Sequence, residues 1–231
     1  MKKYLLGIVL LNMACSGDTV ADKFGVVSGK TLDGSGKPLA GVTILIDNSI
    51  FFNSHLSTRS DVNGSYMVTV PTGAWYAFAQ LKVIYNNLEY QLYLHPDNPS
   101  GFGGEGAIRN FSWKLTGEKP APLSGYYGGL VTIDNFPGVY LENDLIEFHF
   151  TAEGNLVDGS PGQVLTRKTS DGNQIQDIPI GRYTVTAHYK TEKLKLRRWN
   201  SDDVFQESLT FDFQPQIAGQ CDNCFKLEYN K

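Results

Sequence analysis

Residues 25–46, GVVSGKTLDGSGKPLAGVTILI, and residues 57–73, STRSDVNGSYMVTVPTG, decide the fold. Both stretches contain short runs of apolar and β-branched residues, which is typical of strands with one face against a core. Val42, Ile44 and Ile46 fall on one face of such a strand because side chains alternate with a period of two. The pattern therefore predicts β-structure rather than helix.

Turn sequences separate these strands. Asp33 to Gly36 and Asp61 to Gly64 combine acidic, amide and glycine residues, and the second is interpreted as a hairpin turn. Gly36 and Gly64 are expected to have positive φ, because tight turns need that conformation and glycine adopts it without a Cβ clash.

This part of the chain resembles the carboxypeptidase regulatory-like domain, a transthyretin-like β-sandwich common in exported proteins of Bacteroidetes. The resemblance covers about residues 25–116, with a last strand at 110–115. The matching features are Gly29, Gly36-Lys37-Pro38-Leu39, Gly41-Val42, Ser60-Asp61, Asn63-Gly64, Tyr66, and Val70-Pro71 with Gly73. It implies a fold and no activity, since that domain accompanies peptidases without holding their zinc ligands.

The second half of the chain echoes the first. Residues 170–173 and 178–183 (SDGN and IPIGRY) parallel residues 60–63 and 70–75 (SDVN and VPTGAW). We therefore expect an all-β chain of two tandem β-sandwiches, the second related to the first. A length of 231 residues with 24 Gly and 10 Pro suits two turn-rich domains.

The expected division of the chain follows its turn-rich and polar segments. Residues 118–123 contain two prolines and form the predicted linker. The predicted sandwiches are residues 24–117 and 124–231.

The first residues have the layout of a bacterial secretory leader. Lys2 and Lys3 precede an apolar run, and the small Ala14 stands directly before Cys15. This ending resembles the lipobox, with Asn12 where that motif has an aliphatic residue. We expect residues 1–14 to be a signal peptide and Cys15 to be lipidated, with a polar tether over residues 15–23; a plain secreted protein or an uncleaved N-terminus is the alternative. The resemblance implies export and lipid anchoring in the cell envelope, at the outer membrane.

Cys221 and Cys224 are the other two cysteines. In an oxidising compartment they can form a disulfide, and free thiols are the main alternative. Metal or redox work is the weakest reading, because no further ligands cluster nearby in the sequence and the pair precedes a strand-like tail.

Two segments are longer than a minimal sandwich needs and are candidate contact surfaces. One is the Gly- and Pro-rich loop Leu94–Gly106, for which a solvated excursion is the alternative. The other is the charged segment Arg197–Asp203. The candidate partner or glycan contacts in them are Trp199, Arg197, Arg198, Asp202, His95 and Phe102.

Aromatic residues also crowd residues 75–93. Flat rings beside polar groups suit sugars or protein anchors, and core packing is the competing explanation for this group. Its members are Trp75, Tyr76, Phe78, Tyr85, Tyr90 and Tyr93.

No catalytic constellation emerges from the sequence. There is no H-x-x-E or H-E-x-x-H motif, and His149 and His188 alternate with apolar residues as if facing solvent. A net charge of −4 disfavours nucleic acid as a partner. We expect a non-catalytic envelope lipoprotein without cofactor that binds a protein or a glycan, with a structural spacer as the alternative and an unrecognised hydrolase as a weaker one.

Overall fold

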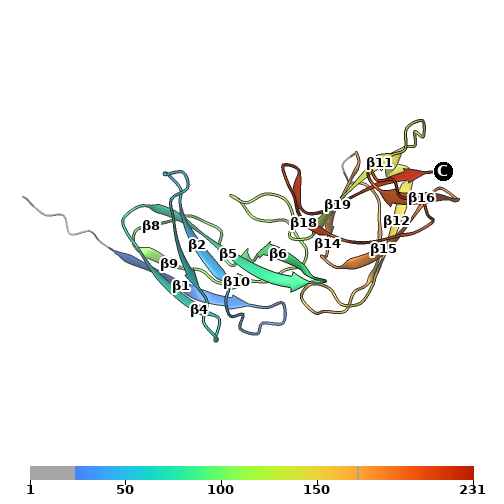
Figure 1. Ribbon diagram of the computed structural model, residues 1–231. Helices are drawn as coiled ribbons and strands as arrows, with labels where there is room; N and C mark the ends of the chain where they lie inside the picture. The colour runs from blue at the N-terminus through green and yellow to red at the C-terminus, as the bar shows by residue number, and fades with distance from the viewer. Residues whose placement is uncertain (1–23, 171) are drawn as a thin grey trace, which may run out of the picture.

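The computed structural model describes residues 24–170 and 172–231. The predicted leader, Cys15, the tether and Asp171 lie outside these residues. The described chain forms two β-sandwiches placed end to end (Figure 1). Within it there is no α-helix, and no helix is long and apolar enough to cross a membrane.

The first sandwich has two facing sheets. One contains, in spatial order, β4 (Ser65–Val70), β1 (Gly25–Leu32), β10 (Phe111–Ser112) and β7 (His95–Pro96), with β9 (Gly106–Ile108) also paired to β1. The other contains β3 (His55–Arg59), β2 (Thr43–Asn48), β5 (Ala74–Tyr85) and β6 (Leu88–Tyr93), with β8 (Phe102–Gly103) paired to β5. Val42, Ile44 and Ile46 are fully buried between the sheets, which confirms the predicted alternation.

The predicted turn glycines have the expected backbone. Gly36 and Gly64 have φ of +85° and +69°. The hairpin interpretation at Asp61–Gly64 is wrong, because β3 pairs with β2 while β4 pairs with β1 in the opposite sheet. The turn instead carries the chain between sheets, and the Asp61 carboxylate holds it by accepting hydrogen bonds from the backbone N–H groups of Asn63 and Ser65.

In the second sandwich, all strands belong to one continuous sheet. Its strands, in spatial order, are β13 (Val164–Arg167), β12 (Ile146–Ala152), β15 (Arg182–Tyr189), β16 (Glu192–Arg198), β19 (Cys221–Asn230), β11 (Gly129–Asn135) and β14 (Gln174–Ile178). β17 (Leu209–Asp212) pairs with β15, and β18 (Gln214–Ile217) pairs with β19. A 3-10 turn at Asn143–Leu145 precedes β12.

The second sandwich repeats the strand connectivity of the first. β11 pairs with β14 as β1 does with β4, and β12 lies between β13 and β15 as β2 lies between β3 and β5. β19 is parallel to β11 as β10 is to β1, and β17 pairs with β15 as β8 does with β5. The main difference is β16, an unbroken strand that replaces β6 and β7 and so joins the two sheets. The second domain is therefore a related sandwich, as expected.

The sequence echo has an atomic basis. Trp75 donates from its indole N–H to the carbonyl of Pro71, and the hydroxyl of Tyr183 donates to the carbonyl of Pro179, four residues earlier in each case. An added Cβ at Gly73 would lie 2.9 Å from the Trp75 ring, and an added Cβ at Gly181 would lie 3.2 Å from the Tyr183 ring. Both glycines leave room for a large ring that folds back onto the preceding turn.

The β5–β6 hairpin joins the two sandwiches. Tyr90 and Leu92 of β6 belong to the hydrophobic core of the second sandwich, and Val83 and Trp113 pack against both cores. The Tyr90 hydroxyl donates a buried hydrogen bond of 2.6 Å to the carbonyl of Phe213. Burial raises the pKa of Tyr90, so its phenol stays a neutral donor.

At the tip of this hairpin more polar contacts follow. The Tyr85 hydroxyl donates to the carbonyl of Asn155 at 2.8 Å and accepts from the backbone N–H of Arg182 at 3.1 Å. Asn86 donates from its amide to Asp212 at 2.7 Å. These contacts fix the second sandwich against the first.

We expect Gly64→Ala to lower the free energy of unfolding by about 2 to 3 kcal/mol. The added Cβ would be strained at positive φ and would lie 2.5 Å from the carbonyl oxygen of Thr31. Gly36→Ala is the matched control, because Gly36 also has positive φ but open space around it, and it should cost only about 1 kcal/mol. Urea unfolding measures both, and equal costs would contradict the close approach to Thr31.

We expect Tyr90→Phe to cost about 1 to 3 kcal/mol, because the carbonyl of Phe213 loses its buried donor. We expect the wild type to unfold in one calorimetric transition, and Tyr90→Ala should open a cavity between the cores and split that transition into two. Tyr76→Phe is the control, since Tyr76 faces outward on β5, and should change stability by less than about 0.5 kcal/mol. Two calorimetric unfolding transitions in the wild type would contradict the coupling of the two sandwiches through Tyr90.

Candidate functional site

Trp199 lies in the turn after β16, on the second sandwich. Its side chain is 40% exposed, and its indole N–H donates to a carboxylate oxygen of Asp134 at 2.9 Å. The ammonium of Lys226 lies 5.1 Å from the ring centre. One face of the ring is therefore already occupied by a cation. A small hollow of about 140 Å³ is lined by Trp199 and Phe225.

The other predicted contacts of this segment differ in exposure. Arg197 forms a mostly buried ion pair with Glu228 at 2.6 Å, and its guanidinium lies 4.4 Å from the ring centre of Phe205. It thus holds the turn together and is not a free surface group. Arg198 and Asp202 are exposed.

His95 and Phe102 lie on the first sandwich, so the structure does not bring them together with Trp199. Within Leu94–Gly106, the short strands β7 and β8 pair with β10 and β5, while residues 97–101 between them form an exposed loop. Phe102 is half-buried under the guanidinium of Arg109, at 5.2 Å.

His95 contributes to the junction between the sandwiches. Its Nδ1 lies 3.0 Å from the hydroxyl of Tyr127. Burial, reinforced by the positive charge of Lys114, lowers the pKa of His95, and burial raises the pKa of Tyr127 to about 12. Both rings are therefore neutral near pH 7.

Cys221 and Cys224 are joined by a disulfide at the start of β19. Asn223 between them has a positive φ of 49°, and the bond closes this irregular turn beside the β18–β19 hairpin. Cys224 is fully buried, so the pair is a structural element of the strand.

His149 and His188 are half-buried and not fully solvent-facing, because their rings pack edge to face across β12 and β15 with centres 5.6 Å apart. Glu147 lies 3.1 Å from His149. Among residues 24–170 and 172–231, no group of three or more His, Cys, Asp or Glu side chains is placed to hold a metal ion.

The outer face of the β5–β6 hairpin carries a polar surface site. Because side chains alternate along β5, Trp75 points into the core while Tyr76, Phe78 and Gln80 point outward. Gln91 lies outward on β6 in the same way, and its amide donates to the amide oxygen of Gln80 at 2.6 Å. The aromatic group of residues 75–93 thus divides between core and surface.

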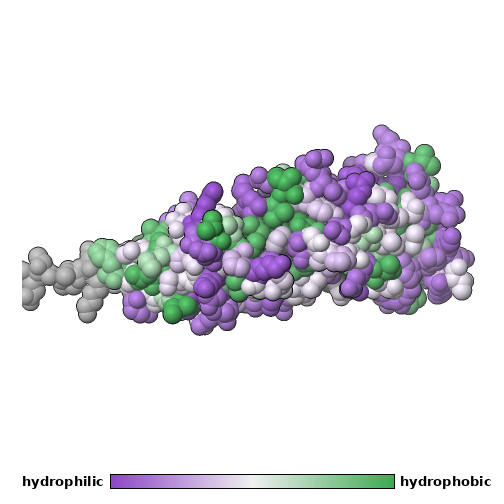
Figure 2. Space-filling model, turned by 90° about the horizontal axis from the view of Figure 1, so that it is seen from below, coloured by the Kyte–Doolittle hydropathy of each residue, from purple (hydrophilic) through white to green (hydrophobic). Residues whose placement is uncertain are grey.

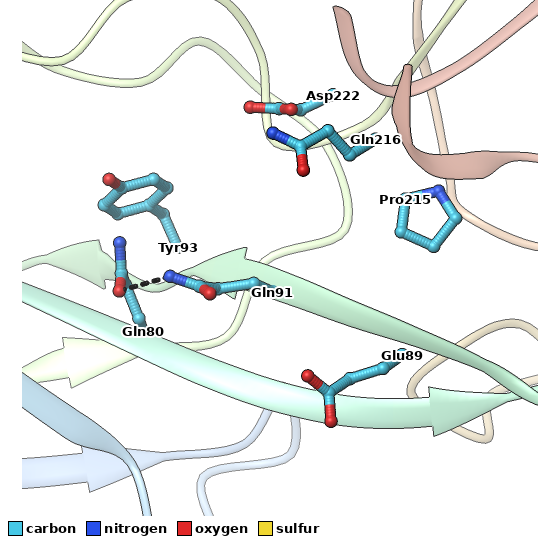
Figure 3. A pocket seen from close by; sticks show the side chains of 7 residues that line it. All are labelled: Gln80, Glu89, Gln91, Tyr93, Pro215, Gln216 and Asp222. Atoms are coloured by element: carbon cyan, nitrogen blue, oxygen red, sulfur yellow. Dashed lines mark hydrogen bonds between the residues drawn. The ribbon is translucent and has the colours of Figure 1, made fainter. Parts of the chain in front are cut away.

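A polar cleft forms where this face meets the second sandwich (Figure 3). It has a volume of about 330 Å³ and is lined by Gln80, Glu89, Gln91, Tyr93, Pro215, Gln216 and Asp222. Figure 3 shows that the side chains of Gln80, Gln91 and Tyr93 rise from β5 and β6, while Gln216 and Asp222 come from the opposite side. Both sandwiches are therefore needed to build it.

The segment between the sandwiches borders the cleft. The Lys119 ammonium lies 5.5 Å from the ring centre of Tyr93. Burial lowers the pKa of Lys119, and the negative charge of Asp222 opposes this effect. Pro122 of the same segment lines a second hollow of about 590 Å³, whose floor includes the stacked rings of Tyr76 and Phe78.

The cleft has the groups of a binding site. Three side-chain amides can both donate and accept hydrogen bonds, two carboxylates accept them, and a tyrosine ring offers a flat face. Its lining contains no Ser, Cys or His, and one of its two carboxylates, Glu89, forms an ion pair with Lys82 at 2.7 Å.

The sequence contained only half of the signal for this site. Alternation in residues 74–93 could have separated the outward residues from the core. Gln216 and Asp222 could not have been assigned to it, because they lie more than a hundred residues away, and the Cys221–Cys224 pair around Asp222 gives no indication of contact with β6.

No family model and no curated protein matches this chain. Among solved structures, the Bacillus anthracis TIE protein is 15% identical with a TM-score of 0.35, over 89% of this chain and 34% of that protein. A streptococcal ancillary pilin is 11% identical with a TM-score of 0.29, over 92% of this chain and 63% of that one. A shaft pilin of Lactobacillus rhamnosus GG is 13% identical with a TM-score of 0.25, over 90% of this chain and 99% of that one.

Catechol 1,2-dioxygenase from Acinetobacter sp. ADP1 matches 42% of this chain at 12% identity, with a TM-score of 0.26. The chain spans about a third of the TIE protein and just over half of the dioxygenase. None of these likenesses carries an argument about what this chain binds or does.

Proposed function

We propose that this chain is a non-catalytic lipoprotein of the cell envelope whose cleft between the sandwiches binds a glycan. The observation that carries the proposal is the convergence of three glutamine amides, two carboxylates and a tyrosine on one polar cleft. Sugars present many hydroxyl groups that both donate and accept hydrogen bonds. Side-chain amides match that chemistry better than fixed donors or acceptors do.

A glycan fits this cleft better than a protein partner does. Protein hot spots are centred on aromatic, arginine or apolar anchors in desolvated pockets. Here the lining is mainly polar and Gln91, Gln216 and Asp222 are exposed to water.

The lipid anchor is part of the proposal. The leader with Lys2 and Lys3, followed by Ala14 and Cys15, supports export and lipidation. The first sandwich is proposed to be a carboxypeptidase regulatory-like domain of a Bacteroidetes outer-membrane protein, on the motifs of residues 25–73.

A structural spacer is the second candidate, and the buried β5–β6 junction favours it. A core shared through Tyr90 and Leu92 keeps the two sandwiches at a fixed angle. Such a rigid pair would hold a partner at a set distance from the membrane. Binding in the cleft and a spacer role are compatible, because the same junction builds both.

We expect the wild type to bind at least one member of a panel of soluble polysaccharides in calorimetric titration. Gln91→Ala and Gln216→Ala should each weaken that binding about tenfold, since each removes a hydrogen-bonding amide from the cleft. Both side chains are exposed, so the melting temperature should stay unchanged.

Gln163→Ala is the matched control, because Gln163 is an exposed glutamine outside the cleft lining. It should bind as the wild type does. A wild type that binds no polysaccharide of the panel would contradict the glycan proposal and favour the spacer.

We expect Cys15→Ala to move the protein from the detergent phase to the aqueous phase in detergent partitioning, because the lipid would be lost. The melting temperature should not change, since every described contact lies within residues 24–231. A variant that still partitions with detergent like the wild type would refute lipidation at Cys15.

A further inference from the structure

The loop between β2 and β3 carries three consecutive apolar side chains in water. Ile50, Phe51 and Phe52, here called the apolar tip, are 69%, 66% and 102% exposed. No charged residue occurs from Asn48 to Ser54. Three adjacent large apolar side chains on a soluble surface mark a contact site rather than random exposure.

The loop holds its shape without these side chains. The side-chain oxygen of Asn48 accepts hydrogen bonds from the backbone N–H groups of Ile50 and Phe51, at 2.9 and 3.0 Å. The backbone N–H of Asn48 donates to the carbonyl of Ser54, and Asn53 takes a left-handed φ of 55°. The apolar tip is therefore presented by a fixed turn and does not stabilise the core.

The apolar tip lies at the end of the molecule where the described chain begins. Ser49 donates from its backbone to the carbonyl of Ala74 at the start of β5, and Phe102–Gly103 pairs with the same residues of β5. Gly25 at the start of β1 is packed against Gly104 and Glu105. Figure 1 shows the loop between β2 and β3 projecting from the top of the first sandwich, and the apolar tip borders the hollow that is also lined by Tyr76, Phe78 and Pro122. Figure 2 shows hydrophobic surface where the described chain begins.

The length of chain between this end and Cys15 is short. Phe24, itself 64% exposed, is nine residues after Cys15. Nine residues span at most about 30 Å when fully extended. A lipid on Cys15 would therefore hold this end of the first sandwich within about one bilayer thickness of the membrane surface.

We propose that the apolar tip inserts into the membrane that holds Cys15 and forms a second point of attachment. This inference rests on the lipid anchor of the proposed function. Phenylalanine and isoleucine side chains gain free energy on entering the boundary between headgroups and acyl chains, and the uncharged loop carries no group that opposes entry. Two attachment points would fix the orientation of the rigid pair of sandwiches, whereas the lipid on Cys15 alone would not.

The test places a fluorophore at the tip of the lipidated full chain. With Cys15 lipidated and Cys221 paired to Cys224, a Phe52→Cys variant has one free thiol, which takes an environment-sensitive dye. Val204→Cys is the matched control, because Val204 is 78% exposed on the second sandwich. The protein is reconstituted into vesicles of phosphatidylethanolamine and phosphatidylglycerol.

We expect the emission of the dye at position 52 to shift to the blue and to rise at least about twofold in vesicles, while position 204 stays unchanged. A chain that floats with the vesicles while both positions respond alike would overturn the insertion and leave the lipid anchor standing. A chain that does not float would overturn both.

A second variant tests the same inference without a label. Phe51→Asp with Phe52→Asp should speed transfer of the lipidated protein between vesicles about tenfold or more, with an unchanged melting temperature, because the loop does not depend on these rings. Val204→Asp should transfer as the wild type does. Equal transfer of all three proteins would overturn the second attachment.

Discussion

The buried hydrogen bond from Tyr90 to the carbonyl of Phe213, with the apolar contacts around it, is the constraint on which the rest of the molecule depends. β6 belongs by its pairing to the first sandwich, yet Tyr90 and Leu92 complete the core of the second. Neither core can be fully packed without the other. The two sandwiches therefore have one relative orientation, and the surface groups along their junction are held at fixed separations.

The cleft follows directly from this junction. One side of β5 and β6 packs into cores, so the alternate residues Gln80, Gln91 and Tyr93 must face outward. The fixed second sandwich then places Gln216 and Asp222 across from them. A flexible linkage between two independent domains would leave these groups at variable distances and could not preorganise a polar site.

The repeated connectivity explains why one chain can build both halves. Each sandwich has the same pairing scheme and the same proline, glycine and aromatic arrangement at Pro71–Trp75 and Pro179–Tyr183. They differ where they meet. In the first sandwich, the β5–β6 hairpin ends in Tyr85 and Asn86, which bond to the second sandwich. In the second, β16 continues unbroken and joins β15 to β19 in one sheet.

Local sequence patterns were enough to predict the all-β class, the strand alternation at Val42–Ile46, the glycines that need positive φ and the echo between the halves, because these depend on local periodicity and on single-residue backbone preferences. The sequence analysis misassigned the hairpin at Asp61–Gly64 and did not predict the short strands β7 and β8, since the sheet a strand joins depends on partners distant in sequence. Packing between distant segments, in contrast, buries the ion pair of Arg197, places Gln216 across a cleft from Gln91, and leaves Phe51 and Phe52 in water. Burial and proximity are properties of packing between distant segments, and no local pattern of residues encodes them.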